Sequence, residues 1–216
     1  MKNGIRINYG CGLEPTKGYR NFDNSACVKL AKHPILTNIF RKCGMLTGRR
    51  AEFIEFCKNH EIEFGNCTKR MPFADDTVGV FYSSHMMEHL DRSDARLFLK
   101  EVHRILATDG ILRLALPDVS VLVSDYVKEG DADKFMDSLC FCTTKPVGFL
   151  SRLSFAFYGF RDHMWMYDGA SLCRFLKENG FEAKVYAPGE TSIPEPGELN
   201  LSERLGQSVY VEAVKR

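Results

Sequence analysis

Hydrophobic and polar positions follow two different periods along this chain. Short apolar or alternating runs predict strands at residues 5–9, 19–23, 78–84, 111–116, 181–186 and 209–214. Apolar residues spaced three and four positions apart predict helices over about 27–60, 91–106, much of 119–168, and 168–180. Strands that alternate with helices indicate an α/β protein.

The middle of the chain contains the clearest unit. A buried strand at 78–84 precedes a helix that Asp91 or Ser93 caps, and Gly110 is expected to be a left-handed residue at the helix exit. The next strand, at 111–116, stops at Pro117. A strand, helix and strand joined by short loops predict a parallel pair with a right-handed crossover.

Two segments interrupt this regular pattern. Residues 27–60 predict a helical insertion of two helices, broken near 44–48, and its basic side chains are interpreted as a solvated face. Residues 119–167 are helical, less regular and rich in aromatic side chains. The chain, residues 1–216, is expected to form one domain that carries both insertions.

A nucleoside-binding pattern follows the first two strands. The first strand ends in Gly10-Cys11-Gly12, where glycine lets the backbone turn sharply and approach a ligand closely. Asp23 follows at the end of the next strand, where its carboxylate can accept hydrogen bonds from ribose hydroxyls. Together these features predict a nucleoside cofactor at the carboxyl edge of a parallel sheet.

Several segments in order resemble class I S-adenosylmethionine-dependent methyltransferases. They are the first motif at 6–12, the region around the fourth strand at 71–90, and the helix and strand at 99–118. The segments 159–168 and 208–215 are similar to methyltransferase-domain proteins often linked to polysaccharide biosynthesis. The resemblance implies a Rossmann-like, mostly parallel seven-stranded sheet with one reversed C-terminal strand and helices on both faces.

The resemblance also implies which residues hold S-adenosylmethionine. The glycine loop would wrap the methionine part, Asp23 would hold the ribose, and the amide oxygen of Asn66 would pair with the adenine amino group. Backbone near Ser84 would line the floor beside the sulfonium. The expected cofactor-binding residues are Tyr9, Gly10, Cys11, Gly12, Asp23, Asn66, Cys67 and Ser84.

The chain departs from the family pattern in two places. Glu14 stands where a third glycine is expected. Asp23 follows Gly12 too closely for a full helix between the first two strands, because a parallel crossover normally needs about a dozen residues or more. We therefore expect a compact loop there.

Two histidines are candidate general bases for a hydroxyl acceptor. His85 lies at the carboxyl end of the fourth strand, and His163 lies in the aromatic segment expected to cover the site. For each, a structural hydrogen bond is an equal alternative. Glu88 is interpreted as a cap or salt bridge and His89 as a packing residue. No cluster of histidines and carboxylates stands out at ligand spacing, so no metal is expected.

The sequence does not identify the methyl acceptor. The segment 119–167 is the expected acceptor-binding lid, although aromatic residues such as Trp165 and Tyr167 are also typical of a core. We expect methyl transfer to a hydroxyl of a small molecule or glycan precursor, with an amine as the less favoured acceptor. The alternatives are a catalytically silent cofactor- or partner-binding domain and an NAD(P)-dependent oxidoreductase. The latter lacks the full Gly-x-Gly-x-x-Gly loop, and Tyr158 has no lysine four positions later.

Composition narrows the classes of binding partner that are expected. The net charge is +1, and 44% of residues are hydrophobic, so neither nucleic acid nor a membrane is the expected partner. The eight cysteines are scattered, which favours free thiols that pack as small hydrophobic groups. The N-terminus has no apolar signal core, so a cytoplasmic location is expected. The sequence does not specify the oligomeric state.

Overall fold

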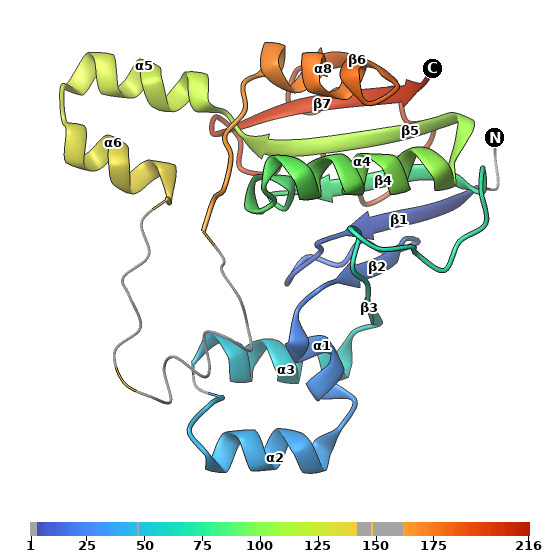
Figure 1. Ribbon diagram of the computed structural model, residues 1–216, viewed down its shortest axis with the longest axis vertical. Helices are drawn as coiled ribbons and strands as arrows, with labels where there is room; N and C mark the ends of the chain where they lie inside the picture. Colours follow the sequence, from blue (N-terminus) through green and yellow to red (C-terminus); the bar gives the residue numbers. More distant parts are fainter. Residues whose placement is uncertain (1–3, 47, 142–147, 149–161) are drawn as a thin grey trace.

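The protein is built on a seven-stranded sheet, seen in a computed structural model that describes residues 4–46, 48–141, 148 and 162–216 (Figure 1). The strand order is β3-β2-β1-β4-β5-β7-β6, and β7 runs antiparallel to both of its neighbours. This confirms the mostly parallel sheet with one reversed C-terminal strand. The strands are β1 Ile5–Tyr9, β2 Arg20–Asp23, β3 Ile62–Phe64, β4 Val78–Ser84, β5 Leu106–Pro117, β6 Phe181–Tyr186 and β7 Ser208–Lys215.

Three helices, rather than the expected two, lie between β2 and β3. The chain breaks after α1 because Pro34 occupies the first turn of α2, where its ring and missing N–H are tolerated. The expected break at 44–48 separates α2 from α3, and the short strand β3, which the pattern did not predict, follows α3. These helices are α1 Ala26–Ala31, α2 Pro34–Lys42 and α3 Arg49–Asn59.

Helices cover both faces of the sheet. On one face α4 (Arg92–Ile105) and α8 (Gly169–Glu178) share one core cluster with apolar side chains of β4, β5 and β7. On the other face, residues of α1 and α3 pack around Ile62 of β3. The remaining helical elements, which follow β4 and β5, are η1 Met87–His89, α5 Val119–Glu129 and α6 Ala132–Leu139.

Helix α4 follows its predicted pattern, with one correction at its exit. Asp91 caps the helix through the backbone N–H groups of Ser93 and Asp94, as expected. The helix ends at Ile105, however, and Gly110 lies inside β5 without a left-handed backbone. A Cβ at Gly110 would approach the Val78 carbonyl oxygen to 2.7 Å. Close contact between strands, and not a helix exit, therefore explains this glycine.

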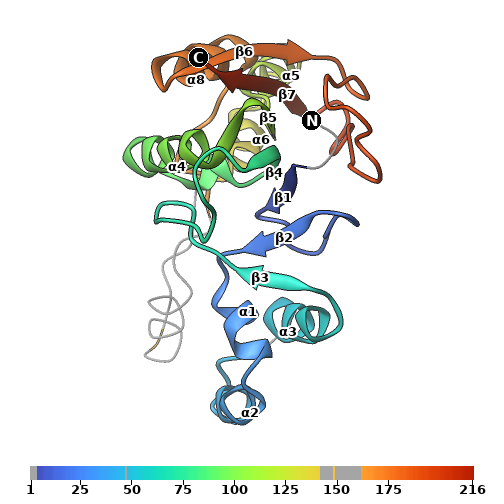
Figure 2. The same cartoon turned by 90° about the vertical axis from the view of Figure 1, so that its right-hand side faces the viewer.

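A buried ion pair fastens the 187–207 loop to the second face of the sheet. Arg113 of β5 is 0% exposed and donates to Glu212, its cross-strand partner on β7, at 2.6 Å. The same guanidinium donates to the carbonyl oxygens of Glu190 and Leu201, which belong to the loop. Figure 2 shows this loop on the opposite side of the sheet from α4. The central strands are thus covered there by loop side chains, among them Ile193 and Leu199.

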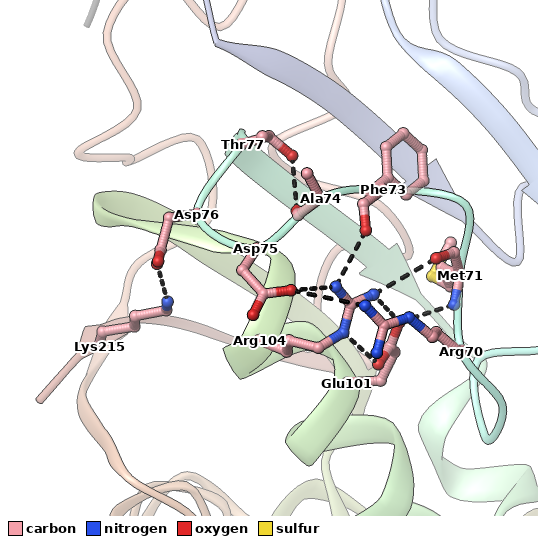
Figure 3. A network of polar contacts seen from close by, with 10 residues as sticks. All are labelled: Arg70, Met71, Phe73, Ala74, Asp75, Asp76, Thr77, Glu101, Arg104 and Lys215. Atoms are coloured by element: carbon pink, nitrogen blue, oxygen red, sulfur yellow. Dashed lines mark hydrogen bonds and ion pairs between the residues drawn. The ribbon is translucent and has the colours of Figure 1, made fainter.

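The loop between β3 and β4 is held against α4 by a second polar network (Figure 3). Arg104 of α4 donates to Glu101, to Asp75 and to the carbonyl oxygens of Met71 and Phe73. Glu101 in turn accepts from the backbone N–H of Met71 at 2.6 Å. Because Asn66 and Cys67 open this loop, the network restricts where they lie relative to β1.

No helix in the described part of the chain is long and apolar enough to cross a membrane.

Replacing Arg113 by methionine should destabilise the fold by about 3–5 kcal/mol near pH 7, because Glu212 would remain as an unpaired buried charge. Burial alone would raise the pKa of Glu212, but hydrogen bonds from Ser192 and Thr191 and the contact with Arg113 outweigh it and lower the pKa. The contribution of Glu212 is therefore present above its unfolded pKa, about 4.3, and disappears as the pH falls through its lower folded pKa. Urea unfolding of both proteins between pH 3 and pH 7 would measure this, and a difference independent of pH would contradict it.

Candidate functional site

The expected cofactor residues come together at one edge of the sheet. Strand β1 is parallel to both β2 and β4, with Tyr9 in register with Phe22 and with Ser83. The carboxyl ends of these strands therefore meet, and the loops after them lie side by side. Figure 1 shows α5 and α6 beyond the same end of β5.

The connection from β1 to β2 is a compact loop, as expected. The amide nitrogen of Asn8 donates to the Glu14 carbonyl oxygen and to the Thr16 hydroxyl, both at 3.0 Å. Asn21 of β2 accepts from the Thr16 backbone N–H at 2.8 Å. The side chains of two strand residues thus take the place of a crossover helix in positioning this loop.

Gly10 and Gly12 both adopt left-handed backbone conformations, with φ of 75° and 51°. A Cβ on Gly10 would lie 2.9 Å from the Cβ and Cγ atoms of Met86, so this glycine allows the loop to pack on the segment after β4. A Cβ on Gly12 would meet nothing within 4 Å. Gly12 therefore presents bare backbone beside open space, as a ligand-facing glycine would.

Asp23 links the glycine loop to the start of α1. Its carboxylate accepts from the Gly12 backbone N–H at 3.2 Å and from the Ser25 backbone N–H at 2.7 Å. Asp23 is the last residue of β2, as the ribose assignment requires. A carboxylate has about four acceptor positions, so two remain for the hydroxyls of a ligand.

Tyr9 and Cys67 contact each other inside the core. The Tyr9 side chain is fully buried, and its hydroxyl accepts from the Cys67 backbone N–H at 2.8 Å and donates to the Gly65 carbonyl oxygen at 2.9 Å. Burial raises the pKa of Tyr9, so the phenol stays neutral. Tyr9 therefore positions the loop after β3, and its side chain does not face a ligand.

The expected adenine contact of Asn66 needs a correction. Its amide oxygen accepts from both the backbone N–H and the hydroxyl of Thr68, at 3.0 and 2.8 Å. That oxygen is therefore occupied by the loop's own turn. The amide nitrogen donates no hydrogen bond to the described residues, so Asn66 is better suited to donate to a purine ring nitrogen.

The cysteines at this edge are buried thiols. Burial raises the pKa of Cys11 and of Cys67 to about 12, so neither is a thiolate near neutral pH. All seven cysteines in the described part of the chain are free, and Cys142 lies outside it.

His85 and Ser84 lie where the sequence predicted, at and just beyond the end of β4. Ser84 is the last residue of the strand and is buried. The His85 side chain is 6% exposed, with Nε2 2.9 Å from the hydroxyl of Ser208 and Nδ1 3.4 Å from the carboxylate of Glu88. The His85 backbone is left-handed, with φ of 45°, an uncommon state that is typical of functional turns.

His163 does not join the glycine loop; it lies with Glu88 and His89 instead. The His89 and His163 rings pack edge to face, with centroids 5.1 Å apart. Burial lowers the pKa of His163, and the nearby Glu88 carboxylate acts in the opposite direction. The sequence interpretation of Glu88 and His89 as structural residues missed this grouping, because His163 is remote in sequence. The sequence feature that could have indicated this grouping is the spacing His85-x-x-Glu88-His89.

The aromatic segment divides between core and surface. Tyr167 is 0% exposed and belongs to the main core, whereas Trp165 is 45% exposed and lies under the guanidinium of Arg92. Tyr167 is therefore a packing residue. Five further aromatic residues of this segment lie outside the described residues: Phe149, Phe155, Phe157, Tyr158 and Phe160.

Known proteins share this fold. Residues 45–114, about a third of the chain, match the family described as "Methyltransferase domain". None of the curated proteins matches the chain. A S-adenosylmethionine-dependent methyltransferase structure from Methanosarcina mazei is 14% identical, with a TM-score of 0.54, over 100% of this chain and 93% of that one.

Two further structures are similar. A S-adenosylmethionine-dependent methyltransferase from Thermotoga maritima, described as a possible histamine N-methyltransferase, is 16% identical with a TM-score of 0.52, over 100% of this chain and 84% of that one. DhpI, in a complex with SAM and HEP, is 14% identical with a TM-score of 0.53, over 97% of this chain and 78% of its own. The sheet order and the glycine loop after β1 are those of a Rossmann-like α/β domain. Residues 45–114 thus match a methyltransferase domain family, and the whole chain shares its fold with structures of S-adenosylmethionine-dependent methyltransferases.

The two glycines of the loop should differ in the stability they contribute. Gly10→Ala should cost roughly 2–4 kcal/mol, because the left-handed backbone strain adds to the collision with Met86. Gly12→Ala should cost only about 1–2 kcal/mol, from backbone strain alone. Urea unfolding at one pH would compare them, and equal losses would contradict the packing role of Gly10.

Proposed function

We propose that this protein transfers a methyl group from S-adenosylmethionine to a hydroxyl of a small molecule or glycan precursor, with an amine as the less favoured acceptor. The observation that carries the proposal is the meeting of Gly12 and Asp23 with His85 at one sheet edge. Gly12 and Asp23 are suited to binding a nucleoside cofactor, and His85 is suited to removing a proton from the acceptor. The glycan class rests on the sequence resemblance alone.

The residues present fit S-adenosylmethionine. When bound, this cofactor supplies a methyl group made electrophilic by a sulfonium. Gly12, whose missing Cβ leaves open space, would let the loop backbone approach the amino acid part. Asp23 would accept from the ribose hydroxyls with its remaining lone pairs, and the amide nitrogen of Asn66 would donate to the adenine ring.

His85 is the favoured general base. Its Nδ1 lies 3.4 Å from the Glu88 carboxylate, which would orient the ring and stabilise the imidazolium. Its Nε2 contacts the Ser208 hydroxyl, and it would exchange this contact for the acceptor hydroxyl. His85 would take the proton of the acceptor hydroxyl, so that the acceptor oxygen could receive the methyl group that the cofactor supplies. Positioning supplies much of the remaining rate enhancement.

The acceptor would enter between this edge and the segment formed by α5 and α6. That segment follows β5, at the same end of the sheet, and exposes Val123, Tyr126 and Val127. Tyr126 and Phe135 pack against each other, with centroids 5.1 Å apart, and join the two helices. Exposed apolar and aromatic side chains of this kind suit the face of a sugar or a planar metabolite.

Calorimetric titration should show that the protein binds S-adenosylhomocysteine at micromolar concentration and does not bind NADPH. Asp23→Ala should weaken the binding about 10- to 100-fold, because a charged acceptor of the ribose hydroxyls is lost. The matched control is Asp109→Ala, an exposed residue at the start of β5, which should bind as the parent does. Binding of NADPH alone would favour an oxidoreductase, and binding of neither would remove the methyltransferase proposal.

His85→Asn should lower the rate of methyl transfer about 100-fold or more while it leaves the affinity for S-adenosylhomocysteine within threefold. The measurement is production of S-adenosylhomocysteine with a panel of sugar nucleotides, phenols and amines. Activity on hydroxyl acceptors is expected. Transfer to amines alone, or cofactor binding without transfer to any member of the panel, would contradict the proposed reaction.

A further inference from the structure

Glu88 is a buried carboxylate that the fold leaves without hydrogen bonds. Its side chain is 1% exposed, and neither carboxylate oxygen has a hydrogen-bond partner among the described residues. An uncompensated buried carboxylate is costly, so native proteins pair it, hydrogen-bond it or use it to coordinate a metal. The groups that face its Oε1 are two imidazoles, His85 Nδ1 at 3.4 Å and His89 Nε2 at 4.0 Å.

His89 is oriented as a metal ligand would be. Its Nδ1 lies 3.1 Å from the carbonyl oxygen of Asp162. A carbonyl only accepts, so Nδ1 carries a proton, and the side of the ring left for a metal is Nε2, which faces Glu88. Ligating histidines commonly hold their second nitrogen in this way.

His163 completes a group of three ligands. One ligand atom from each of Glu88, His89 and His163 lies within 4.8 Å of the other two. The buried Nδ1 of His163 has no hydrogen-bond partner in the described part of the chain. A modest contraction would bring three such atoms to the distances of about 2.0–2.2 Å at which zinc binds nitrogen and oxygen.

Backbone hydrogen bonds hold the two halves of this group together. The N–H groups of Met164 and Trp165 both donate to the carbonyl oxygen of Glu88, at 2.7 and 3.1 Å. The His163 N–H donates to the carbonyl oxygen of Cys140, at the end of α6. The histidine is thus placed by main-chain contacts that do not depend on a bound ion.

We propose that Glu88, His89 and His163 bind a divalent transition metal ion of the zinc type. Two imidazoles and one carboxylate favour zinc, cobalt or nickel over magnesium and calcium, which prefer oxygen ligands. Three protein ligands leave a coordination position open. In a use that rests on the proposed function, that position would take the acceptor oxygen and lower the pKa of its hydroxyl, close to His85.

Binding is tested with the full chain, free of any polyhistidine tag and depleted of metal. Titration with Co²⁺ should produce visible absorption bands that saturate at one equivalent, and Zn²⁺ should abolish them by competition. Zn²⁺ should also raise the melting temperature of the parent. Absence of saturable bands in the parent would overturn the proposal.

Single substitutions then test which residues bind the metal ion. His89→Ala and His163→Ala should each weaken Co²⁺ binding at least about 100-fold. Glu88→Gln keeps the shape of the side chain and should abolish the Zn²⁺ shift in melting temperature. His33→Gln, an exposed histidine before α2, is the matched control and should bind as the parent does. Equal Co²⁺ affinity in the parent and all three ligand variants would overturn the assignment.

Titration of the same samples with S-adenosylhomocysteine separates this proposal from the proposed function. Variants that bind S-adenosylhomocysteine normally are folded, so their loss of Co²⁺ supports the site. Cofactor binding by a parent that shows no Co²⁺ bands would overturn the metal site alone. Co²⁺ binding without cofactor binding would support the metal site while it removed the methyltransferase proposal.

Discussion

The parallel pairing of β1 with both β2 and β4 is the constraint on which the site depends. Because all three strands run the same way, the glycine loop, Asp23 and His85 emerge at a single edge. The pairing is maintained by apolar residues packed under α4 and by the asparagine contacts that replace a helix between β1 and β2. The short loop leaves Asp23 close enough to bond the Gly12 backbone directly.

Two buried carboxylates show how different the roles of buried charge are in this fold. Glu212 contacts Arg113 and accepts from Thr191 and Ser192, so each of its oxygens is satisfied and it serves to fasten a loop. Glu88 is equally buried, yet it faces imidazole nitrogens and has no hydrogen-bond donor among the described residues. A protein tolerates such a group where a ligand or a proton completes it. The contrast distinguishes Glu212, which fastens a loop, from Glu88, which we propose to be a metal ligand.

The sequence predicted most of the framework from local patterns. Strands β1, β2, β4, β6 and β7 and helices α4 and α8 lie where the apolar pattern predicted them, and Asp91 caps α4 as expected. The pattern missed β3, whose three residues are too few to show a period, and the break before Pro34 inside a basic helical stretch. It also misplaced Gly110, because a glycine in a strand and a glycine after a helix look alike in sequence.

What the sequence by itself determined is what depends on neighbours along the chain: the elements, the glycine loop, and an acid at the end of the second strand. The tertiary structure decided what depends on residues remote in sequence. It directed the Tyr9 side chain into the core, where the hydroxyl contacts Cys67. It also engaged the amide oxygen of Asn66 with Thr68 and placed His163 beside Glu88 and His89. Helix and strand periods act over a few residues, whereas these contacts arise only when separate loops meet at one sheet edge.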